Sequence, residues 1–370
     1  MYNKRFIHNT LIFVPIFLVI MGMCMVYSAS CIFAAKKFAD DAFFLKKQAL
    51  FAIGGIIGMF IMMRVPYRYL RACAYPLIVL SFVLLAAVFI PGIGKKVGGA
   101  CRWLCLGPIS FQPSEFAKLA VIIFLSYSLA KKEHKIKIFS IGVLPHLMAV
   151  LPLAGLIVLQ PDFGTTIIFV VLLFGLLFVA GVPARYLIAL GSAAAVAALP
   201  LLVYKGAYRI ERLFAFLDPW GNYRGAGYHI VQSLLAFGSG GVWGRGLGGG
   251  VQKLLYLPEP HTDFILSVIG EEFGFAGVML VIILFGALVW CGLQVALNAG
   301  DLFGTYLALG ITFLIGLQVV INMNVVLGLM PTKGTTLPFI SYGGTSLVMN
   351  LLSIGILVGI SDQSECRVRR

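Results

Sequence analysis

Long blocks of apolar residues recur along the chain and limit its fold more than any other feature. Each block is long enough to cross the roughly 30 Å hydrocarbon layer of a bilayer as an α-helix. Hydrophobic residues make up 60% of the chain and charged residues only 11%, whereas soluble domains are about half apolar and a quarter charged. The sequence therefore predicts an all-α fold, that of a polytopic integral membrane protein.

Ten hydrophobic spans can be placed, and one hydrophilic segment between them is much longer than the rest. The spans are about 11–33, 48–64, 73–91, 114–130, 139–160, 165–182, 186–204, 264–293, 303–325 and 341–361. The long hydrophilic segment, 205–263, separates the seventh span from the eighth. No repeat of fixed period interrupts the pattern, so residues 1–370 are expected to form a single integral membrane domain.

Basic residues set the expected orientation, because short cytoplasmic loops are enriched in Lys and Arg. The two sides carry nearly equal numbers, so a simple count does not decide. The dense cluster KKEHKIK at 131–137 favours a cytoplasmic position for its loop and for both termini. The segment 205–263 is then a large extracytoplasmic loop on an unusually basic outer face. An anionic substrate handled there is one explanation.

The net charge of +14 is assigned to topology and to contact with anionic lipid, because no nucleic-acid-binding motif accompanies it. No nucleic-acid partner is expected.

The apolar run that begins at Leu11 is long for the core of a signal peptide. We therefore expect an uncleaved first transmembrane helix.

The motif QPSEFAK places Glu115 and Lys118 at the beginning of the fourth span. Pro113 suits the first turn of a helix, which puts Glu115 near the positive end of the helix dipole. Lys118, three residues further on, shares its face. Two compatible interpretations remain open: an ion pair that helps the helix to start, or a pair that lines a cavity or pathway.

Three other motifs are expected on the same side of the membrane. Asp162 lies between two spans and is expected to cap the sixth helix. Arg209 and Arg212 share one helical face and suit phosphate oxygens, although an interfacial amphipathic helix would look similar. The glycine-rich segment 237–250 lacks the ending of a P-loop, so nucleotide binding is unexpected. A mobile gating loop and a tightly folded loop both fit it.

The stretch YLPEPHTDFILSVIGEEFGF carries five further ionisable side chains at the edge of the eighth span, Glu259, His261, Asp263, Glu271 and Glu272. Asp263 would lie at the membrane–water boundary, a suitable place for a general base. Desolvation and nearby cations shift the pKa of a carboxyl in opposite directions, so the net direction stays open. His261 is the alternative base. Glu271 and Glu272 are expected to face the protein interior or water, because exposure to lipid is costly.

Several separated motifs together resemble the SEDS family of shape, elongation, division and sporulation proteins. The motifs are RWLCLGPISFQPSEFAK, LQPDFGTT, RLFAFLDPW, GSGGVWGRGLG, YLPEPHTDFILSVIGEEFGF and PTKGTTLPFISYGGTS. The resemblance covers essentially the whole chain, and the last motif, with Lys333, is more similar to the division type FtsW than to the elongation type RodA. His229 stands where the family usually has Gln, and Cys101 and Cys105 flank RWL; neither departure has a predicted consequence.

The resemblance implies a peptidoglycan glycosyltransferase that polymerises lipid II at the outer face of the bacterial cytoplasmic membrane, at the division septum. It also implies a class B penicillin-binding protein transpeptidase and other division-machinery membrane proteins as partners. The essential aspartate of the family falls on Asp263, and its membrane-lip pair falls on Glu115 and Lys118. A sugar hydroxyl would attack with inversion, Asp263 would act as general base, and polyprenyl pyrophosphate would leave.

Substrate contacts are expected from a basic and polar set around this aspartate. These residues are Glu115, Lys118, Arg102, Arg209, Arg212, His261 and Lys333. No cofactor is assigned; if a divalent cation such as magnesium takes part, Asp263 and Glu115 are the expected oxygen ligands. The alternatives are a lipid II flippase, a RodA-type elongation polymerase, an ion-coupled transporter using Glu271 and Glu272, and a non-catalytic scaffold.

Overall fold

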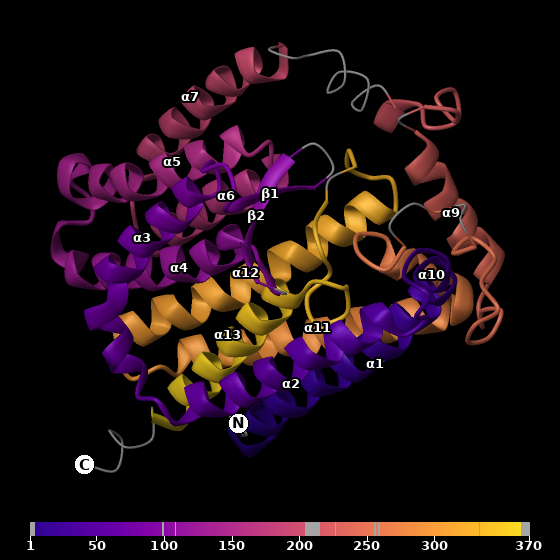
Figure 1. Ribbon diagram of the computed structural model, residues 1–370. Helices are drawn as coiled ribbons and strands as arrows, with labels where there is room; N and C mark the ends of the chain where they lie inside the picture. The colour runs from indigo at the N-terminus through magenta and orange to yellow at the C-terminus, as the bar shows by residue number, and fades with distance from the viewer. Residues whose placement is uncertain are drawn as a thin grey trace.

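Long helices dominate the computed structural model of the chain (Figure 1). The structure describes residues 4–97, 100–107, 109–203, 215–225, 227–254, 257, 260–332 and 334–363. Arg209, Arg212 and Lys333, which the sequence suggests as substrate contacts, lie outside these residues.

Within the described ranges, eight helical segments are long and apolar enough to span a membrane. They are α1 (Lys4–Phe38), α2 (Phe43–Arg64), η1 with α3 (Tyr67–Tyr69 and Leu70–Ala87), α4 (Pro113–Lys131), η3 with α5 (Phe139–Val143 and Leu144–Leu159), α11 (Gly274–Leu297), α12 (Leu302–Val326) and α13 (Gly344–Gln363). Two further apolar helices, α6 (Phe163–Val179) and α7 (Ala184–Val203), match the sixth and seventh predicted spans. The predicted polytopic helical fold is confirmed.

The predicted eighth span is broken, which corrects the single helix expected over 264–293. Helix α10 (Ile265–Glu272) ends before Gly274, where α11 begins. Gly274 has φ +66°, a conformation that glycine adopts without strain. A Cβ atom at this position would lie 2.4 Å from the backbone nitrogen of Gly244. Hydropathy continues across the break, so the sequence pattern does not reveal it.

A three-stranded antiparallel sheet lies between α3 and α4, in a segment for which the sequence predicts no regular structure. Its strands are β1 (Gly94–Val97), β2 (Ala100–Leu106) and β3 (Ile109–Phe111), in that order. Leu104 pairs with Gly94 on one side and with Phe111 on the other. Cys101 and Cys105 both lie on β2 as free thiols. The all-α class describes the chain as a whole, and this small sheet is an addition to it. Strand β2 contacts α4, and β3 contacts α13.

The two ends of the helix assembly are chemically different. At one end, here called the termini end, α1 begins and α13 finishes. There, His8 Nδ1 lies 3.0 Å from Asp362 Oδ1. At the opposite end, here called the Asp263 end, Phe33 near the end of α1 packs against His261. The start of α1 and the end of α13 thus lie at the same end of the described helices.

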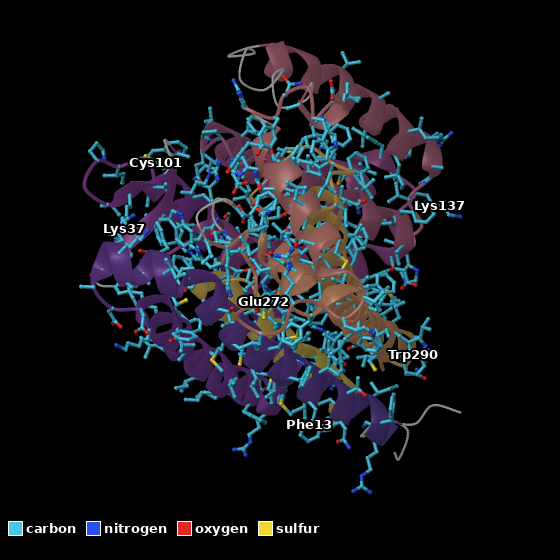
Figure 2. The ribbon with its side chains drawn as sticks, turned by 90° about the vertical axis from the view of Figure 1, so that its right-hand side faces the viewer. Phe13, Lys37, Cys101, Lys137, Glu272 and Trp290 are labelled. Atoms are coloured by element: carbon cyan, nitrogen blue, oxygen red, sulfur yellow. The ribbon has the colours of Figure 1, made fainter. Side chains whose placement is uncertain are left out.

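The helices differ in how deeply they are buried. Most of α4 and α13 is buried inside the assembly, whereas α3 is mostly exposed. Large apolar side chains cover the periphery, where Phe13 is 66% exposed and Trp290 is 50% exposed. Figure 2 shows both of them at the margin, with Glu272 near the centre. Because α4 is central, its polar residues Glu115 and Lys118 are kept away from the apolar surface that lipid would cover.

Candidate active site

Asp263 lies in the turn that leads into α10, at the Asp263 end of the molecule. The side-chain amide of Asn322, in the last turns of α12, donates to the backbone oxygen of Asp263 at 3.0 Å. The same amide donates to the backbone oxygen of Thr335 at 2.6 Å. A Cβ atom on Gly334 would lie 3.1 Å from Asp263 Oδ2. Buried Asn322 thus fixes the turn against the backbone of the 334–343 segment, with the carboxylate partly exposed.

His261 belongs to an aromatic cluster at the base of this turn. Its ring centroid lies 4.5 Å from that of Phe44, 5.7 Å from Tyr342 and 6.1 Å from Phe33. The backbone oxygen of His261 accepts from the backbone nitrogen of Tyr342 at 2.9 Å. Burial raises the pKa of the Tyr342 phenol, so this side chain stays protonated at neutral pH. The cluster holds the Asp263 turn between α1, α2 and the last loop.

Glu115 and Lys118 form the ion pair that the sequence predicts at the start of α4. Lys118 Nζ lies 2.7 Å from Glu115 Oε1, and their side chains are only 4% and 8% exposed. Pro113 occupies the first turn, as expected. The backbone nitrogen of Gln112 donates to Thr345 Oγ1 at 3.2 Å, which joins the start of α4 to the start of α13. The pair is therefore desolvated, and loss of either partner leaves a buried charge.

Arg102 reaches from β2 to the turn between α5 and α6. Its Nε donates to the backbone oxygen of Gln160 at 3.1 Å, and its Nη2 donates to that of Pro161. Asp162 in the same turn accepts from the backbone nitrogen of Thr165 at 3.1 Å and from its hydroxyl at 2.9 Å. The predicted helix cap at Asp162 is confirmed. Arg102 joins the sheet to this turn.

The segment 334–345 connects these groups. Its first residue, Gly334, lies against the carboxylate of Asp263, and Tyr342 contacts His261. Its last residue, Thr345, bonds to the start of α4. The segment belongs to the motif PTKGTTLPFISYGGTS, which the sequence analysis singles out. The structure thus gathers several of the predicted site residues around one stretch of backbone.

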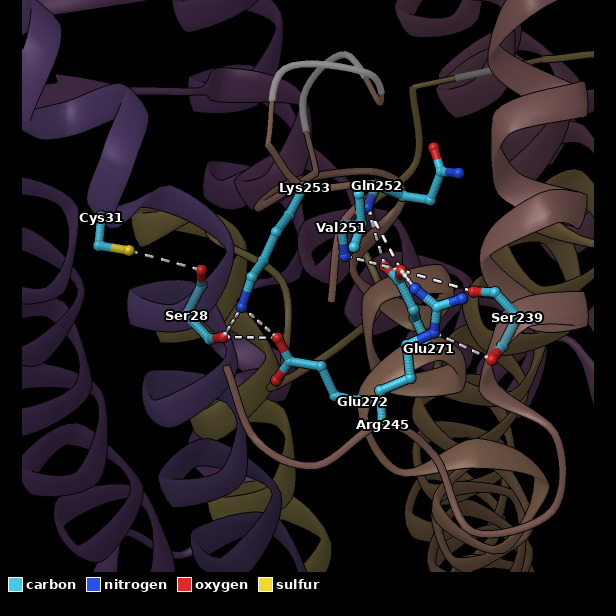
Figure 3. Close-up of polar contacts among 9 residues, drawn as sticks. All are labelled: Ser28, Cys31, Ser239, Arg245, Val251, Gln252, Lys253, Glu271 and Glu272. Carbon is cyan, nitrogen blue, oxygen red and sulfur yellow. Dashed lines mark hydrogen bonds and ion pairs between the residues drawn. The ribbon is translucent and has the colours of Figure 1, made fainter. Parts of the chain in front are cut away.

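Glu272 takes part in a buried network that the sequence analysis does not anticipate (Figure 3). Its Oε1 accepts from Ser28 Oγ at 2.7 Å and pairs with the ammonium group of Lys253. Lys253 Nζ also donates to Ser28 Oγ at 2.7 Å. Glu271 accepts from the backbone nitrogens of Val251 at 2.8 Å and Gln252 at 3.2 Å. Both glutamates face the interior, as expected, but their partners have no local sequence signal.

The glycine-rich loop packs tightly on the end of α10. The backbone nitrogens of Arg245 and Gly246 each donate at 3.0 Å, to the backbone oxygens of Glu271 and Glu272. Gly244 has φ +79°, and a Cβ atom there would lie 2.1 Å from the oxygen of Glu272. Of the two expectations for this segment, the structure favours the tightly folded loop.

His229, the departure from the family pattern, lies on α9 (Tyr228–Gly240). Its ring stacks on that of Phe264, with centroids 5.9 Å apart and planes 19° apart. Phe264 follows Asp263 directly, so α9 contacts the Asp263 turn through this stack.

The described residues include no cluster of three or more His, Cys, Asp and Glu side chains that could hold a metal ion. Glu115, one of the two suggested oxygen ligands, accepts from Lys118 through Oε1. A cation shared by Glu115 and Asp263 would compete with this ammonium group for the carboxylate.

The helices are those of a polytopic membrane protein. Its buried ionisable groups gather beneath the loops at one end, which defines a polar site at one membrane face. A profile of the FtsW/RodA/SpoVE family, described as cell cycle proteins, matches residues 8–366. The chain belongs to this family, which confirms the resemblance inferred from its motifs.

Individual relatives cover nearly the whole chain. The probable peptidoglycan glycosyltransferase FtsW of Trichlorobacter lovleyi is 49% identical over 343 residues, which cover 92% of this chain and 89% of the relative. Stage V sporulation protein E of Bacillus subtilis is 44% identical over 355 residues, covering 96% and 97%.

Two solved structures share the fold at 30% identity. A chain from a structure on the coordination of polymerization and crosslinking by a peptidoglycan synthase complex superimposes with a TM-score of 0.80, covering 96% of this chain and 97% of that one. The rod shape determining protein RodA of Thermus thermophilus gives a TM-score of 0.70, covering 95% and 96%. The architecture is therefore that of known polytopic membrane proteins of this family.

Proposed function

We propose that this protein is a peptidoglycan glycosyltransferase that polymerises lipid II at the outer face of a bacterial cytoplasmic membrane. Relatives that are 49% and 47% identical carry the name peptidoglycan glycosyltransferase. The observation that carries the proposal is the placement of Asp263, a partly exposed carboxylate fixed by Asn322 at one end of the membrane-spanning helices. A substrate with a lipid tail and a polar head can reach such a site from the bilayer.

In the proposed reaction, Asp263 takes the proton from the attacking sugar hydroxyl as general base. The oxygen forms a bond to the anomeric carbon of the second lipid-linked sugar, with inversion, and the bond to polyprenyl pyrophosphate breaks. Preorganised positive groups stabilise the charge that builds on the leaving pyrophosphate. We assign this role to Arg209, Arg212 and Lys118, the last held in place by Glu115.

The remaining predicted contacts take supporting roles in this proposal. Arg102 and Lys333 bind the substrate, and Glu115 orients Lys118. His261 is enclosed by Phe44 and Tyr342, so we assign it to positioning the Asp263 turn and not to proton transfer.

A divalent cation such as magnesium is a separate proposal. Carboxylate oxygens of Asp263 and Glu115 suit it, and a cation there would neutralise part of the charge on the pyrophosphate. Polymerisation in the presence of excess chelator tests this. Activity that persists unchanged would contradict a role for the cation.

We propose that both termini are cytoplasmic, that the Asp263 end lies outside, and that the protein works at the division septum. Its partners would be a class B penicillin-binding protein transpeptidase and other division-machinery membrane proteins. Two observations support these partners: the FtsW name of relatives and the likeness to a chain from a peptidoglycan synthase complex. Localisation of a tagged chain tests the septal role, and a uniform distribution along the cell wall would favour elongation instead.

The decisive experiment supplies lipid II to the purified full-length protein with its transpeptidase partner. In the Asp263→Asn variant we expect polymer formation to fall at least 100-fold, because a general base contributes about 10²–10⁴ in rate. Thermal unfolding should stay close to wild type. The matched control is Asp362→Asn, the same change at an exposed aspartate of the termini end.

Full polymerisation by Asp263→Asn would exclude the general-base role. Movement of lipid II across the membrane by the wild-type protein, without any polymer, would favour the flippase alternative.

A further inference from the structure

A cavity with both charged and apolar walls lies at the termini end, away from the groups assigned to polymerisation. Its volume is about 580 Å³, within the range of small-molecule sites. It is lined by Arg71, Tyr127, Ala130, Lys131, Gly300, Asp301, Leu302 and Phe303. None of these residues takes part in the proposed reaction.

The cavity lies at the level where membrane-spanning helices end. Arg71 is in the first turn of α3, Lys131 is the last residue of α4, and Asp301 caps the start of α12. The other ends of α4 and α12 carry Glu115 and Asn322, which belong to the Asp263 end. The cavity therefore faces the opposite leaflet boundary from the candidate active site.

Arg71 is fixed in the cavity wall by Asp301. Its Nη2 pairs with Asp301 Oδ2, and its guanidinium lies 5.1 Å from the ring centroid of Phe303. Asp301 also accepts from the backbone nitrogen of Gly304 at 2.8 Å and from the hydroxyl of Tyr67 at 3.2 Å. The Asp301 carboxylate thus already accepts from several protein donors. It neutralises Arg71 but not Lys131, the other cation in the lining.

Donors remain available for an anionic ligand. A guanidinium carries five N–H donors, and the Arg71 side chain stays 39% exposed. Its Nε is buried and finds no acceptor among the described residues, so the exposed Nη groups are the donors that a ligand can reach. Lys131 is exposed and lies 5.8 Å from the ring centroid of Tyr127. Arg71 and Lys131 together present two positive groups to one space.

An apolar stripe continues from the cavity along α3. Tyr75, one turn beyond Arg71, is 51% exposed, and its ring centroid lies 5.8 Å from that of Tyr127. Val79, a further turn along, is 62% exposed. Residues four apart share one helical face, so Arg71, Tyr75 and Val79 form a line from the cavity toward the middle of the membrane. Tyrosine at such a level is typical of a membrane interface.

We propose that this cavity binds the headgroup phosphate of an anionic phospholipid, with the acyl chains lying along the exposed face of α3. Basic pockets between transmembrane helices bind such headgroups. A free phosphate would use Arg71 and Lys131 but not the aromatic wall or the stripe. With the orientation given under the proposed function, this lipid lies in the cytoplasmic leaflet. No other part of the proposal depends on that orientation.

The test uses the purified full-length protein and a photoactivatable phosphatidylglycerol, with adducts mapped by mass spectrometry of peptides. We expect adducts on the peptides that contain Tyr127 to Lys131 or Gly300 to Phe303. Unlabelled phosphatidylglycerol should compete. Phosphatidylcholine with the same acyl chains, and inorganic phosphate at the same concentration, should not.

Two variants test the assignment without disturbing the Arg71–Asp301 pair. Lys131→Gln should lower the adduct yield about fivefold, the effect expected for one basic residue at a membrane surface. Ala130→Phe should lower it by filling the cavity without changing the charge. Lys137→Gln is the matched control, since Lys137 is exposed, lies outside the lining and projects from the edge of the molecule (Figure 2).

Three outcomes would overturn the proposal. Equal competition by phosphatidylcholine would show that the headgroup charge is not recognised. Equal competition by inorganic phosphate would indicate a site for free anions. Equal losses in Lys131→Gln and Lys137→Gln would indicate general surface attraction with no specific site.

Discussion

Two buried carboxylate–ammonium pairs in this protein have the same chemistry and different settings. Glu115 and Lys118 are three residues apart on one helix, at the start of α4. Glu272 and Lys253 are 19 residues apart, on the end of α10 and on a loop, and Ser28 of α1 joins them. All four side chains are at most 8% exposed. The first pair belongs to the proposed substrate end, whereas the second joins three segments of the fold. Equal burial therefore does not imply equal function.

The largest expected difference concerns activity after both charges of a pair are removed. Replacing both partners avoids an uncompensated buried charge, so folding should be retained. We expect Glu115→Gln with Lys118→Met to lower polymerisation about 100-fold, the usual cost of losing a group that stabilises transition-state charge. Glu272→Gln with Lys253→Met should polymerise lipid II at close to the wild-type rate.

Polymer yield from lipid II and thermal unfolding are measured on the same preparations. Equal loss of polymer in both double variants would abolish the distinction between the two pairs. Normal polymerisation by the first double variant would remove Lys118 from the mechanism.

The next effect concerns stability after one partner is removed. Glu272→Gln leaves the ammonium group of Lys253 buried without its carboxylate, which typically costs about 3–5 kcal/mol. The loss should appear as a lower free energy of unfolding, and the double variant with Lys253→Met should recover most of it. Denaturant or thermal unfolding in detergent provides the measurement.

Lys46→Met is the matched control for this prediction. Lys46 pairs with Asp40 at 2.8 Å, but the two side chains are 67% and 34% exposed, and exposed pairs add little stability. A comparable loss in this variant would show that burial is not the cause. Failure of the double variant to recover would indicate that Lys253 packs the loop independently of its charge.

The same contrast separates what the sequence predicts from what it does not. The Glu115–Lys118 pair and the Asp162 cap depend on spacing within a few residues, so helical periodicity is enough to infer them. The contact between Ser28 and Glu272 joins residues 244 apart. It depends on the path of the whole chain, and no local pattern encodes that path.

The missed elements of the fold have equally specific causes. The sheet strands contain seven residues or fewer, too few for an alternating pattern to stand out from a polar loop. The break at Gly274 lies within continuous hydropathy, and its signal is a positive φ angle that only the structure shows. The sequence predicts Asp263 just before the eighth span, and it lies in the turn before α10. Asn322, which bonds to this turn, carries no signal within its apolar span.

The smallest expected effect concerns two aspartates that cap helices at opposite ends of the molecule. Asp162 accepts from the backbone nitrogen of Thr165 at 3.1 Å, and Asp301 accepts from that of Gly304 at 2.8 Å. Asp162→Ala should lower the free energy of unfolding by about 1 kcal/mol, the usual cost of losing a cap. Asp162→Asn keeps an oxygen acceptor and should be nearly neutral.

Activity decides whether Asp162 does more than cap α6. If its role is limited to the cap, polymerisation by Asp162→Asn should match the wild type, because asparagine caps helices about as well as aspartate. A stable Asp162→Asn variant with much lower polymer yield would add a third carboxylate to the proposed substrate end. That result would place the turn held by Arg102 in contact with lipid II and extend the site from Asp263 to the start of α6.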